Sequence, residues 1–187
     1  MPFLGRPSGS NTRPVASDGA ESRKPGCLRH NRVLLLSVAA AILLADQLTK
    51  LWALRQLADG SIDLFWTIRL RLVFNQGTAF GLGSSLAPVI TVAAALVALL
   101  LLRLTWSNTR PGVAVLAGLV FGGALGNLGD RAFRGDGFFG GSVVDFVDLQ
   151  WWPVFNVADS AISVGVVLFA VVGLRASRRG DPMLEGA

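Results

Sequence analysis

The chain has 187 residues, of which 52% are hydrophobic and only 16% are charged. This composition fits one domain, is too apolar for an ordinary soluble protein, and favours a protein embedded in a bilayer. The net charge of +5 does not indicate nucleic acid, because the basic residues lie in short groups beside apolar runs. With one cysteine, one histidine and no CxxC pair, the sequence offers neither an intramolecular disulfide nor a metal site. We therefore expect no metal, no cofactor and no nucleic-acid partner.

Three regions follow from the pattern of apolar residues. Residues 1–31 are rich in Pro, Gly, Ser, Asn and Arg, which predicts a disordered tail. Residues 32–176 carry the apolar segments and are predicted to form one membrane domain, and residues 177–187 form a second short tail.

Four segments are long enough to cross a hydrocarbon core of about 30 Å as helices. They are residues 33–54, 86–102, 112 to about 126, and 157–174. The third is short, and its glycines at every fourth position, Gly118, Gly122 and Gly126, predict close approach of a neighbouring helix. The expected fold is an all-α membrane protein with four transmembrane helices and a small extracytoplasmic β-region.

Lys and Arg residues near the segment ends indicate the orientation. Basic groups precede the first segment, join the second to the third, and follow the fourth. All three groups fall on one side of the membrane when four helices alternate, so both termini are expected in the cytoplasm. The connections 55–85 and 127–156 then face outward. In the first connection, apolar residues alternate from Ile62 to Leu72, which predicts β-structure at the outer surface.

Charged side chains within a membrane protein are expensive to bury and therefore indicate a partner or a function. Five polar clusters map to the outer half of the predicted bundle. They are Asp46-Gln-Leu-Thr-Lys50, Asn75-Gln-Gly77-Thr-Ala-Phe80, Gly122-Gly-Ala-Leu-Gly-Asn127-Leu-Gly-Asp130-Arg131, Val143-Val-Asp145-Phe146 and Phe155-Asn156-Val-Ala-Asp159-Ser160. Segments distant in the sequence thus bring polar groups to one depth.

Several of these clusters also have purely structural interpretations. Asp46 and Lys50 are four residues apart on a helix and can neutralise each other. Asn75 with Gly77 is typical of a turn.

Two further clusters lie at predicted helix ends. Asn127, Asp130 and Arg131 share one of them, where an Asp130–Arg131 pair or an ion pair with another helix is the default expectation. Asn156 followed by Asp159 resembles a capping box at a helix N-terminus.

Asp145 is harder to explain as a structural residue. It lies in an apolar run with no basic residue nearby, and desolvation there would raise its pKa. Together with Asp159 it could form a pair in which a protonated carboxyl polarises a peptide carbonyl while the ionised partner takes a proton from water. The only histidine lies in the predicted tail, which disfavours Ser-His or Cys-His chemistry.

The order and spacing of the five clusters over residues 31 to 175 resemble bacterial signal peptidase II, the lipoprotein signal peptidase. The resemblance implies an intramembrane aspartic endopeptidase that removes signal peptides from diacylglyceryl-modified prolipoproteins, cutting before the lipidated cysteine. It implies that Asp145 and Asp159 are catalytic. Residues implied to line the site or hold substrate are Asp46, Lys50, Asn75, Gly77, Asn127, Asp130, Arg131 and Asn156.

The expected partners are diacylated prolipoproteins and membrane lipid, and we expect a monomer. The expected location is the bacterial cytoplasmic (inner) membrane, with the active site near the outer face. The alternative from a different class is a small proton- or ion-coupled membrane transporter that uses the intramembrane acids as a relay. Against it, the sequence shows no internal two-fold repeat.

Overall fold

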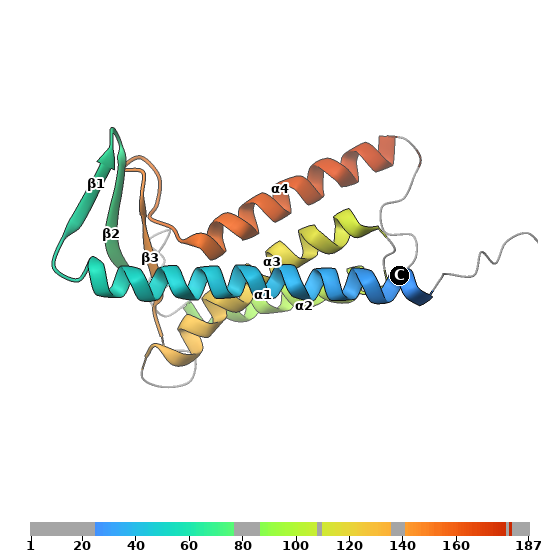
Figure 1. Cartoon of the computed structure of the whole chain (residues 1–187), viewed down its shortest axis with the longest axis horizontal. Coiled ribbons are helices and arrows are strands. Elements are labelled where there is room, and N and C mark those ends of the chain that lie inside the picture. The colour runs from blue at the N-terminus through green and yellow to red at the C-terminus, as the bar shows by residue number, and fades with distance from the viewer. Residues whose placement is uncertain (1–24, 77–86, 108–109, 136–140, 179, 181–187) are drawn as a thin grey trace, which may run out of the picture.

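The computed structural model describes residues 25–76, 87–107, 110–135, 141–178 and 180, and the side chains of residues 25 and 87–94 are outside this description. Gly77 and most of the predicted N-terminal tail therefore lie outside the described residues. These ranges form four helices and one antiparallel sheet of three strands (Figure 1). The elements in chain order are α1 Pro25–Gln56, β1 Ser61–Phe65, β2 Ile68–Asn75, α2 Ala87–Thr105, α3 Pro111–Phe133, β3 Val143–Asp148 and α4 Val157–Arg178.

Three helices in the described part of the chain, α1, α3 and α4, are long and apolar enough to cross a membrane, and α2 contributes a shorter apolar stretch over Ala95–Thr105. The predicted, mostly helical membrane fold is therefore confirmed. Two boundaries differ from the prediction. Helix α1 already begins at Pro25, and α3 is not short, because it continues to Phe133. Polar side chains after residue 126 find partners inside the bundle, so they do not end the helix.

Helix α3 lies between α1 and α4 and makes close backbone contacts with both. A Cβ atom added to Gly122 would lie 2.6 Å from the carbonyl oxygen of Ala39 in α1. A Cβ atom added to Gly123 would lie 2.6 Å from the carbonyl oxygen of Ala158 in α4. The close approach of neighbouring helices predicted from the glycine spacing is therefore confirmed.

The sheet stands at the end of the bundle where α1 ends (Figure 1). The alternating segment predicted as β-structure forms β1 and β2, and β3 pairs with the other edge of β2. Strand β1 is exposed along its whole length, whereas five of the six residues of β3 are buried. The register places Val73 opposite Asp145 and Asn75 opposite Val143.

Strand β3 is held against the bundle by a small apolar cluster. Ala53 and Leu57, at the end of α1, pack with Phe146 of β3, and all three side chains are buried. Asp145 precedes Phe146, so this packing fixes the height of that carboxylate relative to α1. The exposed strand β1 and the buried strand β3 give the sheet one free edge and one anchored edge.

We expect Gly122→Ala to lower the melting temperature of the purified protein in detergent micelles. A Cβ at 2.6 Å from a backbone oxygen forces α1 and α3 apart, and overpacking of this kind costs about 1–3 kcal/mol. Gly129→Ala is the matched control, because it lies on the same helix and a Cβ there meets nothing within 4 Å. Equal losses in the two variants would contradict this account of the packing.

Candidate active site

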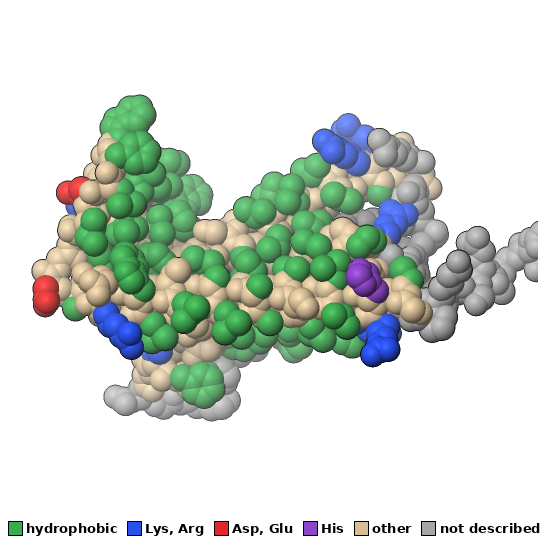
Figure 2. Space-filling model, viewed as in Figure 1, with side chains coloured by type: hydrophobic (Ala, Val, Ile, Leu, Met, Phe, Trp, Pro, Cys, Tyr) green, Lys and Arg blue, Asp and Glu red, His purple; other side chains and the backbone are tan. Residues whose placement is uncertain are grey.

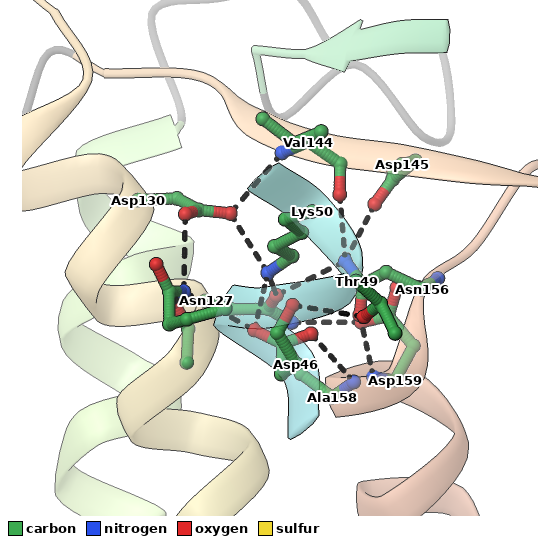
Figure 3. Close-up of polar contacts among 12 residues, drawn as sticks. Asp46, Thr49, Lys50, Asn127, Asp130, Val144, Asp145, Asn156, Ala158 and Asp159 are labelled. Carbon is green, nitrogen blue, oxygen red and sulfur yellow. Dashed lines mark hydrogen bonds and ion pairs between the residues drawn. The ribbon is translucent and has the colours of Figure 1, made fainter. Parts of the chain in front are cut away.

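The ammonium group of Lys50 lies at the centre of a buried polar cluster near the sheet. Its Nζ atom lies 2.7 Å from Asp46 Oδ2 and 2.7 Å from Asp130 Oδ2, and it donates a hydrogen bond to Asn127 Oδ1 at 3.0 Å (Figure 3). Lys50, Asp46 and Asp130 are fully buried. An ammonium group has three donors and no acceptor, so these three oxygens satisfy it. The predicted Asp46–Lys50 pair is confirmed as part of this larger set.

The two acids beside Lys50 connect it to α4 and to the sheet. Asp46 Oδ1 accepts a hydrogen bond from the backbone N–H of Ala158 at 2.9 Å, in the first turn of α4. This is the positive end of a helix dipole, which favours a carboxylate. Asp130 Oδ2 accepts from the backbone N–H of Val144 in β3 at 3.2 Å. One lysine on α1 is thereby linked to α3, α4 and β3.

Sequence reasoning missed two side chains of this cluster, Gln47 and Arg134. Gln47 Nε2 donates to the carbonyl oxygen of Gly126 at 3.2 Å and to Asp130 Oδ1 at 3.3 Å. Arg134 Nε donates to Asp130 Oδ1 at 2.6 Å, and its Nη2 donates to Gln47 Oε1 at 3.3 Å. Asp130 lies in the last turn of α3 and Arg134, four residues later, is its C-cap, so this spacing is the signal that could have identified Arg134.

Asp145 is buried in β3 and receives one amide hydrogen bond on each carboxylate oxygen. Asn75 Nδ2 donates to Oδ2 at 3.0 Å, and Asn156 Nδ2 donates to Oδ1 at 2.7 Å. Burial and the nearby negative charge of Asp159 raise the pKa of Asp145 to about 7, although the two amides and Lys50 act in the opposite direction. The expectation that desolvation raises this pKa is therefore confirmed.

Asp159 lies in the first turn of α4, where it forms a reciprocal cap with Asn156. The backbone N–H of Asn156 donates to Asp159 Oδ2 at 3.2 Å, and the backbone N–H of Asp159 donates to Asn156 Oδ1 at 2.9 Å. The capping box expected from the sequence is present. Asp159 Oδ1 also accepts from Asn127 Nδ2 at 2.8 Å, so this carboxylate does more than cap a helix.

Asn156 joins the two carboxylates. Its backbone and side-chain oxygen bind Asp159, and its side-chain nitrogen binds Asp145 and, at 3.1 Å, Asn127 Oδ1 (Figure 3). Asn127 in turn contacts both Lys50 and Asp159. A continuous chain of amide contacts therefore runs from the Lys50 cluster to both aspartates.

The structure bears on two structural interpretations of the sequence. Asn75 is the last residue of β2 and donates to Asp145, and the turn predicted for Asn75 with Gly77 extends outside the described residues. Of the two ion pairs considered for Asp130, the pair with another helix is confirmed by Lys50 on α1, and on its own side of the chain Asp130 pairs with Arg134, not with its neighbour Arg131. Adjacent helical residues point in different directions, whereas residues four apart share a face.

Arg131 is 7% exposed, and its Nη1 atom has no hydrogen-bond partner within the described residues. Its positive charge interacts through space with the charges of Asp145, Asp130 and Asp159. Arg131 therefore lies close enough to the paired aspartates to influence their charge.

The arrangement supports acid–base chemistry at two neighbouring carboxyl groups. Asp145 has a pKa at which it can hold a proton near neutral pH, and Asp159 is only partly buried. Within the described ranges, no group of three or more His, Cys, Asp or Glu side chains could hold a metal ion. A protonated carboxyl beside an ionised one suits activation of a water molecule against a carbonyl carbon.

A family model described as signal peptidase (SPase) II matches residues 38–175. The chain belongs to the signal peptidase II family. The matched range includes every site residue predicted from the sequence, and the family consists of peptidases. The chain is 43% identical to the lipoprotein signal peptidase of Rhodococcus jostii over 162 residues, covering 84% of this chain and 81% of that protein. It is 39% identical to the lipoprotein signal peptidase of Mycobacterium avium, covering 86% and 87%.

Solved structures agree with this membership of the signal peptidase II family. A bacterial membrane enzyme determined by the in meso method at 2.3 Å resolution superposes with a TM-score of 0.65, at 26% identity, over 76% of this chain and 88% of that one. A second, determined at 1.9 Å resolution, has a TM-score of 0.63 at 25% identity, over 74% and 90%. The fold is therefore that of a membrane enzyme.

We expect Lys50→Met to destabilise the protein by about 3–5 kcal/mol, because it leaves buried carboxylates without their shared cation. The double variant Asp46→Leu with Lys50→Met should lose less than the sum of the two single losses. Thermal unfolding of all four members of the cycle measures this coupling. Arg55→Met, an exposed cation on the same helix, is the control and should change stability by no more than about 0.5 kcal/mol. Strictly additive losses would refute the pairing.

Proposed function

We propose that this chain is an aspartic endopeptidase that removes signal peptides from diacylglyceryl-modified prolipoproteins, with Asp145 and Asp159 as its catalytic pair. Membership of the signal peptidase II family supports the reaction. The observation that supports the assignment of the pair is the position of Asn156, which contacts both carboxylates and so holds them in one site.

In the proposed mechanism, water lies between the pair and the scissile carbonyl carbon. Asp159 takes a proton from this water as its oxygen bonds to the carbonyl carbon, and Asp145 donates its proton to the carbonyl oxygen. The tetrahedral diol then collapses: the C–N bond breaks, Asp159 returns its proton to the leaving nitrogen, and Asp145 recovers a proton from the diol. The pair thus ends in its starting protonation state.

The supporting residues divide into two groups in this proposal. Asn75, Asn127 and Asn156 hold the carboxylates by neutral amides, which neither donate nor accept a proton in the reaction. The positive charge of Arg131 offsets part of the negative charge of the pair. Asp46, Lys50 and Asp130 position the elements that carry these groups, and Gly77 belongs to the same sequence motif as Asn75.

We further propose four transmembrane helices, cytoplasmic termini and an active site near the outer face of the bacterial cytoplasmic membrane. Basic residues support this orientation. Arg103 lies in the last turn of α2, Arg110 is the N-cap of α3, and Arg175 lies in the last turn of α4. On α4, the basic end is the end opposite to the one that carries Asp159. Arg32 near the start of α1 donates from Nε to the carbonyl oxygen of Trp106, just after α2, at 3.1 Å. That contact brings the start of α1 and the end of α2 to one side. The substrate would meet the pair near the lipid boundary, and we propose that the enzyme acts as a monomer.

We expect Asp145→Asn and Asp159→Asn each to abolish cleavage of a synthetic diacylated prolipoprotein, at least a hundredfold in kcat/KM (roughly the scale of removing general acid–base catalysis). The amide keeps the shape of the carboxyl but cannot exchange the proton. The double variant should be scarcely worse than either single one, because the pair acts as a unit.

Asp63→Asn, on the exposed strand β1, is the matched control and should retain activity. A helix cap alone predicts a different result, because Asn is itself a good cap and Asp159→Asn would then turn over substrate at nearly the normal rate. Near-normal turnover by either single variant, at equal amounts of folded protein, would remove that residue from the pair.

We expect kcat/KM to fall as the pH rises through about 7. The pKa of Asp145 is raised, so its proton is bound below that pH and lost above it, and the acid of the pair is lost with it. Asn75→Leu removes an amide that favours the ionised form, so the alkaline limb of this variant should move to higher pH. An alkaline limb that stays in place or moves downward in Asn75→Leu would contradict the assignment.

A further inference from the structure

An apolar groove of about 470 Å³ includes Asp159 in its lining, and its other lining residues have no part in the proposed mechanism. One wall is formed by the connection between β3 and α4, with Trp151, Trp152 and Phe155. The other wall is one face of α4, with Asp159, Ser163 and Val164. The volume falls in the range of small-ligand sites, and most of the lining is apolar. In Figure 2, hydrophobic side chains border the notch between the sheet and α4 on both sides.

The aromatic wall is fixed at both of its ends. Before the tryptophans, Asp148 Oδ1 accepts the backbone N–H of Gln150 at 2.8 Å, and Gln150 adopts a left-handed φ of 68°. After them, Phe155 forms an antiparallel bridge with Val147. A non-glycine residue at positive φ is uncommon and persists where the surroundings hold it.

Asp148 is itself anchored to the sheet. Arg69 Nη2 lies 2.7 Å from Asp148 Oδ2, and Arg71 Nε lies 2.6 Å from the same oxygen. Two arginines of β2 therefore fix the residue that shapes the turn before the tryptophans. Trp151 and Trp152 are 71% and 58% exposed, with their ring centroids 6.2 Å apart in an edge-to-face contact. Two large apolar rings are thus held open at the entrance of a groove, not buried in a core.

We propose that this groove binds one acyl chain of the diacylglyceryl group on the substrate cysteine. The inference rests on the proposed function, which puts the lipid-bearing cysteine directly after the scissile bond. The acyl chains attached to that cysteine therefore begin within one residue of the catalytic pair. Asp159 is both a member of the pair and a lining residue of the groove, so the groove starts where the lipid is attached.

The dimensions of the groove favour a slender occupant over a peptide helix. A helix with its side chains is about 10–12 Å across, so one turn of about 5.4 Å fills roughly 400–600 Å³. The whole groove would therefore hold little more than a single helical turn of the signal peptide. On the α4 wall, Ser163 has a small side chain, and Val164 lines the groove one residue further along the apolar helix. A hydrocarbon chain can follow this path, and its burial against the indole rings is favourable.

The first test compares two synthetic substrates with the same peptide, one carrying palmitoyl and one carrying octanoyl chains, in nanodiscs. Ser163→Leu places a branched side chain in the groove and should raise KM for the palmitoyl substrate about tenfold with little change in kcat, which is the pattern of lost uniform binding. Trp152→Ala should act in the same direction. Both variants should lose less on the octanoyl substrate.

Ser177→Leu is the matched control, because it makes the same change at an exposed position of α4 that does not line the groove, and it should behave as wild type. A palmitoyl-to-octanoyl preference that is unchanged in both Ser163→Leu and Trp152→Ala would overturn the assignment.

The second test uses the Asp145→Asn enzyme and the same lipopeptide with a photoreactive diazirine on one acyl chain. Crosslinks should map to residues 149–164. A phospholipid carrying the same diazirine in the nanodisc should not compete for this segment, which separates the substrate lipid from bulk lipid. Substrate crosslinks that map elsewhere, or equal labelling by the phospholipid, would overturn the inference while leaving the proposed function intact. Failure of the wild-type enzyme to cleave any diacylated substrate would instead remove the proposed function and this inference together.

Discussion

The buried ammonium of Lys50 is the constraint on which the rest of the site depends. A charge removed from water must be compensated fully, and here the compensation comes from two carboxylates and one amide on different elements. Asp46 links Lys50 to the first turn of α4 through a hydrogen bond from a backbone N–H, and Asp130 links it to β3 in the same way. Neither element can slide without leaving a buried charge or backbone donor unpaired. The helices are thus held in the one register that brings Asp145 and Asp159 together.

The contacts between this charged cluster and the proposed catalytic pair, Asp145 and Asp159, are made by neutral amides. Asn127 and Asn156 hold Asp159, and Asn75 and Asn156 hold Asp145. Direct lysine or arginine partners would favour two fully ionised carboxylates, whereas amides position the oxygens with a smaller effect on their charge. The pair can then keep one proton near neutral pH, as the raised pKa of Asp145 indicates. The amides thus mainly position the two carboxylates, whereas burial and the neighbouring negative charge mainly determine the protonation of Asp145.

Local spacing was enough to predict part of this site. The Asp46–Lys50 pair and the Asn156–Asp159 cap each lie within one helical turn, so the sequence alone indicated both. The contact of Asn75 with Asp145 depends on pairing between strands distant in the sequence, and no local pattern encodes that register. Asp130 illustrates the same limit, because its cation on α1 and its donor on β3 are both distant. The extent of α3 was also underestimated, since its final polar residues were expected to end the helix.

The central claim is that water attacks the bond before the lipidated cysteine directly, with no covalent intermediate on the enzyme. The most direct test is cleavage of a diacylated prolipoprotein in H₂¹⁸O containing hydroxylamine, with both products analysed by mass spectrometry. The account predicts a signal peptide whose new carboxylate carries ¹⁸O, and a second product that begins with the lipidated cysteine. An acyl-enzyme would be intercepted by the added nucleophile. A signal peptide released as a hydroxamate, or a cut at any other bond, would contradict the account.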